Sequence, residues 1–467
     1  MKEEKTELEA LKDNLFLKRE HYSFSKTEEE VAAADAYCES YKDFLNSAKT
    51  ERECNKAIVA LAEKNGFVPY DRTKQYKAGD RVYLNNRNKA LILAVIGKKG
   101  ASEGVKIVAS HIDSPRLDLK PTPVYEDSEI AYFKTHYYGG LRKYQWTAIP
   151  LSLHGVVVKA DGEEVTVSLG EKEGEPKFVI TDLLPHLAKE QSKRTLSDGV
   201  RGEELNILIG SRPFKKDKSS ESVKANVLLL LHEKYGITEE DFISAELELV
   251  PAFPVCDIGF DRSMVGGYGH DDRVCAYPGF TALFDAEEPE HTALMVLADK
   301  EEIGSDGNTG LNSAFLKYFI ADLAKAEGME GRHVLSMSEC LSADVNACFD
   351  PTFPSVHDKN NAAFLNHGVV VTKYTGARGK SGTSDAHAEF VGKVRRILNS
   401  ANVCWQTGEM GKVDEGGGGT VAMFVANLNV DVVDLGVPVL SMHAPFEVVS
   451  KADVYSTYEA CKAFFES

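Results

Sequence analysis

Four short aliphatic runs, each followed by a histidine or an acidic residue, form the clearest pattern in the chain. Runs of this length that are rich in aliphatic and β-branched residues predict buried strands. The runs cover residues 105–110, 292–298, 333–337 and 437–442, and the polar residues beyond them are His111, Glu302, Asp344 and His443. Ligand sites in open α/β sheets form beyond the carboxyl ends of the strands. We therefore expect these four side chains to meet at one edge of a sheet.

The first 66 residues have the charged pattern of helices. Ser25 with Glu28, and Thr50 with Glu53, have the spacing of a capping box at a helix N-terminus. Gly66 then predicts a helix end, because glycine readily adopts the left-handed conformation that closes many helices. We therefore expect the chain to begin with helices that precede its first strands.

Between residues 119 and 248 the pattern changes and β-rich segments appear. Segments 150–159 and 165–169 flank Asp161-Gly162, a dipeptide typical of tight β-hairpin turns. An amphipathic helix is expected near 222–234. None of the polar residues at the strand ends falls within 119–248, so we interpret this stretch as an inserted domain.

The remaining residues, 1–118 and 249–467, are expected to form one catalytic domain. From about residue 249 onward, strands and helices alternate, which is typical of a mostly parallel sheet covered by helices. The predicted fold class is therefore α/β, with a mostly parallel central sheet flanked by helices and interrupted by the β-rich insert. A chain of 467 residues is long enough for two such units.

Charge and composition argue against several classes of partner. The formal net charge is -18, whereas nucleic acids and anionic membranes bind basic faces. No aliphatic run is long enough to span a bilayer, and no signal-peptide core is visible near the start. The 8 cysteines are dispersed without a CxxC pair, which argues against a thiolate zinc finger and favours a reducing compartment. We therefore expect a cytoplasmic protein with no nucleic-acid or membrane partner.

The candidate site combines carboxylates with imidazoles. Oxygen and nitrogen donors of this kind suit Zn²⁺, Co²⁺ or Mn²⁺ rather than Cu(I) or an iron–sulfur cluster. The expected ligands are His111, Asp271, Glu302, Asp344 and His443. Two divalent cations against three carboxylates leave a net positive charge, which would ionise a shared water to hydroxide and polarise a substrate carbonyl.

Asp271 lies in the glycine-rich turn at 266–273, which suits a carboxylate that bridges two metals. Its neighbour His270 is a rival ligand. Asp113 follows His111 by two residues on the same extended segment, and it could accept a hydrogen bond from the ring N–H that faces away from the metal. Each motif alone is more often an ordinary core or surface feature, and their shared placement after strands carries the hypothesis.

Glu301 and Glu302 form the sharpest local motif. Adjacent residues at a strand end point in different directions, so Glu302 can bind a metal while Glu301 faces the water. A glutamate in that position is expected to act as the general base and later to donate the proton to the leaving amine. The alternative is an ordinary pair of solvated acidic residues.

Several segments resemble the M18 family of metalloaminopeptidases, the aspartyl aminopeptidase family, and in particular its bacterial branch. The matching segments are 109–121, 270–273, 299–305, 342–344, 411–420 and 441–447, together with 138–140 and 185–188 inside the insert. The motifs occur in the family's order and cover nearly the whole chain. The resemblance implies a zinc-exopeptidase-like fold and an enzyme with two divalent ions, for which zinc is the expected metal.

The resemblance also assigns roles and an assembly. The implied roles are one metal on His111, Asp271 and Asp344, a second metal on Asp271, Glu302 and His443, and general-base catalysis by Glu301. The insert would form dimers that assemble into a closed tetrahedral dodecamer. Two departures from eukaryotic members stand out: Asp272 replaces an asparagine, and Glu190 replaces a second histidine of the insert. If that histidine serves a neighbouring subunit, His136 or His186 would have to take its place here.

The leading hypothesis is an aminopeptidase that acts on peptides, because a free α-amine can bind one metal while the scissile carbonyl binds the other. A related deacylase or other amidohydrolase is a second possibility. The third is a non-catalytic assembly protein that keeps its metals for structure. An intact Glu301 argues against the third, since a purely structural metal site needs no base.

The resemblance implies acidic N-terminal residues as substrates, and a preference for neutral residues is the alternative. The negative net charge opposes an acidic substrate, so a local cation must attract it. The loop at 373–384 carries Lys373, Arg378 and Lys380 among small residues. An arginine could grip a carboxylate through two parallel hydrogen bonds, whereas a lysine would act as a point charge. This loop either lines the pocket for the acidic side chain or is an ordinary solvated basic loop. The glycines at 416–419 form either a flexible loop or a stretch of backbone that passes close to the site.

Overall fold

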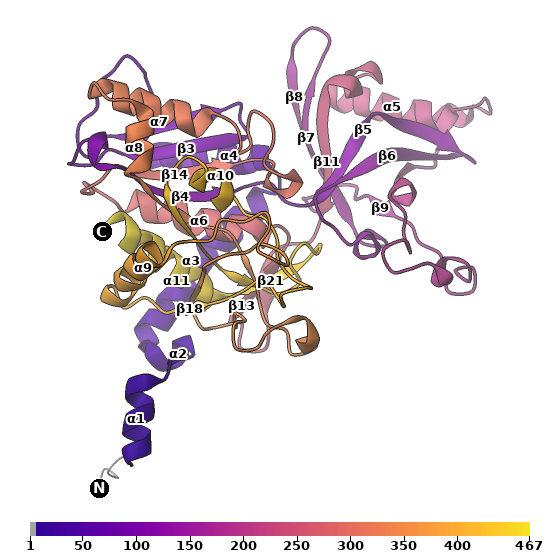
Figure 1. Ribbon diagram of the computed structural model, residues 1–467. Helices are drawn as coiled ribbons and strands as arrows, with labels where there is room; N and C mark the ends of the chain where they lie inside the picture. Colours follow the sequence, from indigo (N-terminus) through magenta and orange to yellow (C-terminus); the bar gives the residue numbers. More distant parts are fainter. Residues whose placement is uncertain (1–5) are drawn as a thin grey trace.

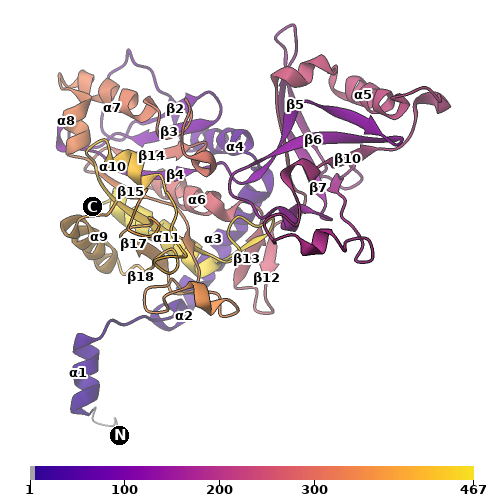
Figure 2. The same ribbon diagram turned by 45° about the vertical axis from the view of Figure 1, so that its right-hand side comes forward.

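The computed structural model describes residues 6–467, which fold into two lobes. Figure 1 shows a larger lobe of strands and helices beside a smaller lobe in which strands dominate. The two lobes are also distinct in Figure 2, where the view is turned by 45° and α1 (Glu7–Leu15) extends from the larger lobe. No residue of α1 is buried. No helix within residues 6–467 is both long and apolar enough to cross a membrane.

The larger lobe is built on a nine-stranded sheet. Its strands, in spatial order, are β1 (Val68–Pro69), β2 (Arg81–Asn86), β3 (Ala90–Val95), β14 (Ala293–Ala298), β4 (Lys106–His111), β15 (Glu339–Ser342), β19 (Asp431–Gly436), β17 (Val369–Thr372) and β18 (Trp405–Thr407). At the centre, β14, β4, β15 and β19 pair in parallel. Antiparallel pairs join β3 to β2 and to β14, and β17 to β19. The predicted mostly parallel sheet is confirmed.

Helices cover both faces of this sheet, because its central strands are apolar on both sides. In β3, for example, Leu91 and Leu93 face one helical layer while Ile92 and Ala94 face the other. One layer consists of α3 (Glu28–Ser47), α4 (Glu51–Lys64), α6 (His270–Phe284), α9 (Ala388–Ser400) and α11 (Lys451–Phe465). The opposite layer consists of α7 (Phe315–Ala326), α8 (Gly331–Ser336) and α10 (Ala422–Ala426), of which α7 and α8 lie at the upper left of Figure 1.

The first helices begin and end at polar residues, as their sequence predicts, with one correction. Thr50 caps α4 by accepting a hydrogen bond from the Glu53 N–H, and Gly66 follows the helix with a φ of 82°. The prediction that Ser25 caps the N-terminus of a helix was wrong. Ser25 ends the short helix α2 (Tyr22–Ser25), and Thr27 caps α3 through a complete capping box with Glu30.

Two of the four aliphatic runs were assigned wrongly. Residues 333–337 lie mainly in α8, where Val334 and Leu335 are buried under the sheet, and the strand is the following segment β15. The run at 437–442 contributes only the two-residue strand β20 (Pro438–Val439), which pairs with β16 (Asn346–Ala347) outside the central sheet. A short apolar run fits a buried helix or a strand equally well by period alone.

The smaller lobe is a seven-stranded antiparallel sheet. Its strands, in spatial order, are β8 (Glu164–Leu169), β7 (Leu151–Val158), β11 (Ala245–Pro251), β5 (Arg116–Asp127), β6 (Ile130–Tyr138), β10 (Ile207–Gly210) and β9 (Val179–Ile180). The hairpin at Asp161-Gly162 and the helix α5 (Ser222–Tyr235) are confirmed. The first and last strands, β5 and β11, pair with each other at Leu117 and Leu249. The chain therefore leaves the larger lobe and returns to it at one place.

Candidate metal centre

Five of the predicted ligands form two overlapping groups of three that share Asp271. His111, Asp271 and Asp344 make one group, and Asp271, Glu302 and His443 make the other. Within each group, one ligand-type atom per residue lies within 4.8 Å of the others. The arrangement is that of two neighbouring sites for cations.

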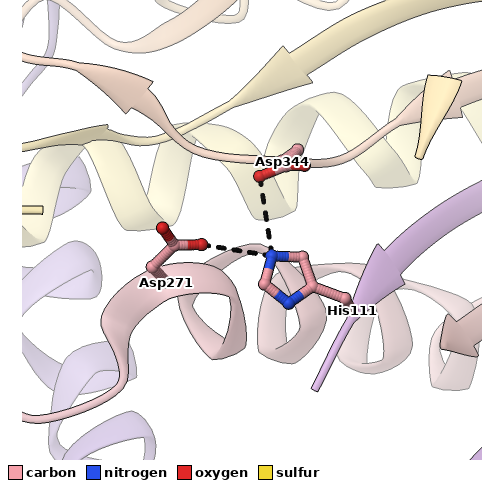
Figure 3. A group of neighbouring side chains, drawn as sticks. All are labelled: His111, Asp271 and Asp344. Carbon is pink, nitrogen blue, oxygen red and sulfur yellow. Dashed lines mark ion pairs between the residues drawn. The ribbon is translucent and has the colours of Figure 1, made fainter. Parts of the chain in front are cut away.

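The strand ends explain the first group. His111 is the last residue of β4, and Asp344 lies just beyond β15, the parallel neighbour of β4. Asp271 comes from a different direction, at the start of α6 (Figure 3). His111 Nε2 lies 3.1 Å from Asp271 Oδ1 and 3.8 Å from Asp344 Oδ1. One imidazole nitrogen therefore faces both carboxylates.

The second group uses the other side of Asp271. His443 Nε2 lies 3.1 Å from Asp271 Oδ2 and 3.6 Å from Glu302 Oε2. Glu302 belongs to the helical turn that follows β14, and His443 precedes β21 (Glu447–Ser450). The two oxygens of Asp271 thus face two different histidines, as a bridging carboxylate requires.

Unpartnered oxygens mark this centre as a place for cations. Asp271 Oδ1 and Glu302 Oε1 are buried and have no hydrogen-bond donor. Burial, followed by the charge of Asp271, raises the pKa of Glu302 well above its ordinary value. Burial and the charge of Asp272 raise the pKa of Asp344 in the same direction. Buried carboxylates are stable as anions only with compensating charge, and an oxygen and imidazole set of this size fits two zinc-type ions.

Asp113 organises the neighbouring backbone. It is fully buried, and its Oδ1 and Oδ2 accept hydrogen bonds from the N–H groups of Glu301 and Glu302, each at 3.2 Å. His111 Nδ1 donates to the carbonyl oxygen of Asp113 at 3.1 Å and lies 3.3 Å from Oδ1. A carbonyl oxygen only accepts, so Nδ1 carries the hydrogen and Nε2 is left free to bind a metal.

Glu301 is placed beside the first group without joining it. Its Oε2 lies 4.0 Å from His111 Nε2. Burial raises the pKa of Glu301 to about 7, against the opposing charge of His111. A carboxylate that titrates near neutral pH is suited to exchange protons with water.

Other residues of the centre have roles that the sequence did not predict. Glu447 is buried and accepts hydrogen bonds from the N–H groups of His443 and Asp271, at 2.7 and 3.1 Å. It fixes the backbone of two candidate ligands, and the only sequence signal was its place in the matched segment 441–447. His270, the rival ligand, faces the hydroxyl of Tyr41 at 2.8 Å and belongs to neither group.

The basic loop at 373–384 is closely tied to its surroundings. Lys373 and Lys380 both form ion pairs with Asp385, and the Lys380 ammonium lies 3.8 Å from the centre of the Tyr374 ring. Arg378 lines a cavity of about 150 Å³. The cavity is also bounded by Glu409, Gly416 and Gly417 among others.

The glycine-rich segment packs directly against this basic loop. A Cβ on Gly417 would lie 2.5 Å from the backbone of Ala377, and one on Gly416 would lie 1.8 Å from the Met410 carbonyl oxygen. These glycines are therefore required by close backbone contact. The backbone that Gly417 approaches belongs to the basic loop, and an approach of this segment to the catalytic site stays a prediction.

Comparisons with known proteins agree with this geometry. Residues 44–465 match the family described as aminopeptidase I zinc metalloprotease (M18). The chain is 49% identical over 435 residues to the "Probable M18 family aminopeptidase 1" of Clostridium acetobutylicum, covering 91% of this chain and 94% of that protein. The crystal structure of the M18 aminopeptidase of Thermotoga maritima superposes with a TM-score of 0.92 at 45% identity, covering 96% and 99% of the two chains. The S. cerevisiae mApe1 dodecamer shares the fold, with a TM-score of 0.74 at 21% identity over 94% and 97% of the two chains.

Proposed function

The chain belongs to the M18 family of zinc metalloaminopeptidases and is a peptide-bond hydrolase, and on that premise we propose a two-metal mechanism for the removal of N-terminal residues. The first metal would be held by His111, Asp271 and Asp344, and the second by Asp271, Glu302 and His443. The carrying observation is that the two oxygens of Asp271 each lie 3.1 Å from a different histidine. One carboxylate would then offset the repulsion between two cations.

The chain's own residues would manage the protons. Bound cations supply Lewis acidity, which polarises the scissile carbonyl and lowers the pKa of water. Glu301 would accept the proton of the attacking water and deliver it to the nitrogen of the leaving amine. Asp113 accepts a hydrogen bond from the Glu301 N–H. This bond fixes the backbone from which the Glu301 side chain extends.

Substrate preference is the finer part of the proposal. We propose that Asp and Glu are the favoured N-terminal residues and that Lys373, Arg378 and Lys380 supply the attraction. Arg378 and Lys380 both border the small cavity, but Lys380 shares the carboxylate of Asp385 with Lys373. Arg378 is therefore the best placed of the three to grip an acidic side chain. A preference for neutral residues is the competing possibility.

Assembly is proposed on the same premise. The relative from S. cerevisiae has been solved as a dodecamer. We propose that residues 119–248 form the dimerisation domain of this chain and that dimers build a dodecamer in the cytoplasm. A closed assembly would admit peptides to the metal centre and exclude folded proteins.

A metal-reconstitution assay tests the catalytic proposal. The chain is freed of metal, reconstituted with Zn²⁺, Mn²⁺ or Co²⁺, and offered a panel of aminoacyl chromophores and N-acyl amino acids. We expect hydrolysis of the aminoacyl substrates alone. Turnover of N-acyl amino acids would instead indicate a deacylase, and metal binding without any turnover would indicate an assembly protein.

The bridging role of Asp271 has its own test. We expect Asp271→Ala to lose both metals, measured by elemental analysis after gel filtration. Asp272→Asn is the matched control, because Asp272 is an adjacent buried carboxylate that belongs to neither group, and the asparagine oxygen can still accept from the His111 N–H. It should keep both metals. Two metals retained in Asp271→Ala would contradict the bridge.

A further inference from the structure

The smaller lobe reaches into the metal centre through three consecutive residues at the end of β6, Tyr138, Gly139 and Gly140. We refer to them as the Tyr138–Gly140 segment. Strand β6 runs antiparallel to β5, and Tyr138 pairs with Arg116, the first residue of β5. Since β5 starts shortly after His111, the β5–β6 hairpin returns to the point where the chain left the site.

Tyr138 acts on the general-base side of the centre. Its hydroxyl donates to Asp113 Oδ2 at 2.8 Å, and the same oxygen accepts from the Glu302 N–H at 3.2 Å. The other oxygen of Asp113 accepts from the Glu301 N–H. One fully buried carboxylate therefore links the hydroxyl to the backbone of both glutamates.

A buried ionic network fixes the ring of Tyr138. The guanidinium carbon of Arg116 lies 3.7 Å from the ring centroid, a close cation–π contact. Arg116 is held in turn by Asp118 at 2.8 Å, Glu248 at 3.2 Å and Glu51 at 3.4 Å. Glu51 begins α4 in the larger lobe, so the network joins both lobes to the tyrosine.

The two glycines act on the second group of ligands. The carbonyl oxygen of Gly140 accepts a hydrogen bond from His443 Nδ1 at 2.8 Å. The hydrogen is thereby assigned to Nδ1, and Nε2 faces Asp271 and Glu302 with its lone pair. Gly139 has a φ of 75°, and a Cβ there would lie 3.2 Å from both Cβ and Oε2 of Glu302. A side chain at Gly139 would therefore require Glu302 to shift by a few tenths of an ångström, in addition to the strain of its left-handed backbone.

We propose that the Tyr138–Gly140 segment is a positioning element of the catalytic centre. It would select the His443 tautomer, set the carboxylate of Glu302, and brace the backbone of Glu301 through Asp113. The smaller lobe would thus complete each active site within its own chain, in addition to any role in assembly. The inference rests on the proposed two-metal function.

Zinc stoichiometry tests the glycines. In Gly139→Ala we expect the metal content of the purified holoenzyme to fall from two zinc ions to about one, because the Asp271, Glu302 and His443 group is disturbed. Gly162→Ala is the matched control: Gly162 has a φ of 88° in the same lobe, and a Cβ there meets nothing within 4 Å. It imposes similar backbone strain and should retain two zinc ions.

Steady-state kinetics test the tyrosine, also in the event that Gly139→Ala fails to fold. In zinc-loaded Tyr138→Phe we expect kcat to fall about tenfold or more, the typical effect of losing a hydrogen bond to a charged group, while KM stays within about twofold. A merely structural role would lower the melting temperature and the active fraction together, so kcat is calculated per zinc-loaded site. The control is Tyr137→Phe, because Tyr137 is a neighbouring tyrosine that is 41% exposed.

The outcomes separate the two proposals. Loss of zinc in Gly139→Ala or loss of kcat in Tyr138→Phe, with both controls normal, supports the positioning role. The inference alone would be overturned by the following result: the wild type is active with two zinc ions, Tyr138→Phe has the wild-type kcat, and any folded Gly139→Ala holds two zinc ions. A wild type that binds fewer than two zinc ions would overturn the proposed function, and the inference with it.

Discussion

At the scale of single residues, the centre is held by buried carboxylates that belong to neither ligand group. Asp113, Asp272 and Glu447 each accept hydrogen bonds from backbone N–H groups of the residues around the site. The amides bound in this way are those of His111, Asp271, Glu301, Glu302 and His443. Pinning the backbone restricts where each ligand can point. Substitutions of the side chains alone should therefore have local effects, and the prediction for Glu301 depends on this.

Glu301→Gln should keep the fold and both metals but lower kcat by at least about 100-fold, the typical contribution of general acid–base catalysis. Glutamine matches the size of glutamate and cannot accept the proton. Turnover of an aminoacyl chromophore and elemental analysis measure the two effects separately. Glu302→Gln is the contrast, since it should lose metal. Wild-type turnover in metal-replete Glu301→Gln would remove this residue from the mechanism.

Arg378→Ala should reduce kcat/KM for Glu- and Asp-substrates by roughly tenfold or more, the effect of losing hydrogen bonds between charged groups, with little change for a Leu-substrate. Lys373→Ala and Lys380→Ala should also affect Glu- and Asp-substrates more than a Leu-substrate. Their effects should be smaller, because the positive charge of each lysine is already partly neutralised by Asp385. Arg395→Ala, at an exposed position of α9, is the control. Equal losses for all substrates, or a wild type that prefers Leu, would contradict an acidic pocket here.

The residues of the candidate site were largely predictable from the sequence, and their supports were not. His111 and Glu302 follow apolar runs that are strands, and a ligand-type residue after a strand is a local feature that can be recognised. Glu447 and Tyr138 are different, because their hydrogen bonds join residues far apart in the chain. Nothing in the local sequence indicates which distant amide or carboxylate they will meet.

At the scale of elements, the sheet was predictable where strands are apolar on both faces, as in β4 and β14. The strand predicted at 333–337 was wrong because a half-buried helix and a buried strand have the same short apolar pattern. The lobe junction was beyond prediction for another reason. Its contacts are charged groups that would each be expected at the surface, such as Glu51 and His154, yet both are buried.

His154 should make stability depend on pH at this junction. It lies on β7 of the smaller lobe, with Nδ1 at 2.7 Å from Glu53 and Nε2 at 3.0 Å from Glu171, which also pairs with Lys49. Burial lowers the pKa of His154, but the hydrogen bonds to Glu171 and Glu53 outweigh it and raise the pKa to about 9. The unfolded value is near 6.5. The stabilisation is therefore complete below about pH 6.5 and is lost as the pH rises through 9.

Thermal unfolding between pH 6 and pH 10 measures this effect. The melting temperature of the wild type should exceed that of His154→Gln at pH 6, and the gap should narrow as the pH approaches 10. His333→Gln, an exposed histidine on α8, should show no such trend. A gap that stays constant across this range would mean that the charge of His154 contributes nothing.

At the scale of the whole molecule, exposed leucines on the smaller lobe bear on assembly. Leu183, Leu184 and Leu187 are each more than half exposed within five residues, and clustered apolar exposure of this kind marks interaction surfaces. Light scattering of the intact chain should give a mass several times the 51.3 kDa of one chain. The double variant Leu183→Asp, Leu187→Asp should give a smaller species. Ile243→Asp is the control, because Ile243 is as exposed as Leu187, at 67%, and no other exposed large hydrophobic residue lies within five positions of it in the sequence.

A monomeric wild type would contradict the proposed assembly directly. An unchanged mass for the double leucine variant would leave the assembly in place and exclude this leucine cluster from its interface. Removing residues 119–248 entirely should also yield a smaller species. It would remove the Tyr138–Gly140 segment at the same time, so loss of zinc in that deletion is expected as well.

The pairing of β5 with β11 has a consequence for the order of folding. In the central sheet, His111 pairs with Ala298 across the whole smaller lobe, and closing so long a loop costs conformational entropy. If the lobe folds first, Leu117 and Leu249 are already adjacent, and the loop left to close is about a third as long. The saving is on the order of 1 kcal/mol. We therefore expect pulsed hydrogen exchange during refolding to show that the amides of β5 and β11 are protected before those of β4 and β14. The opposite order would mean that the smaller lobe does not fold first.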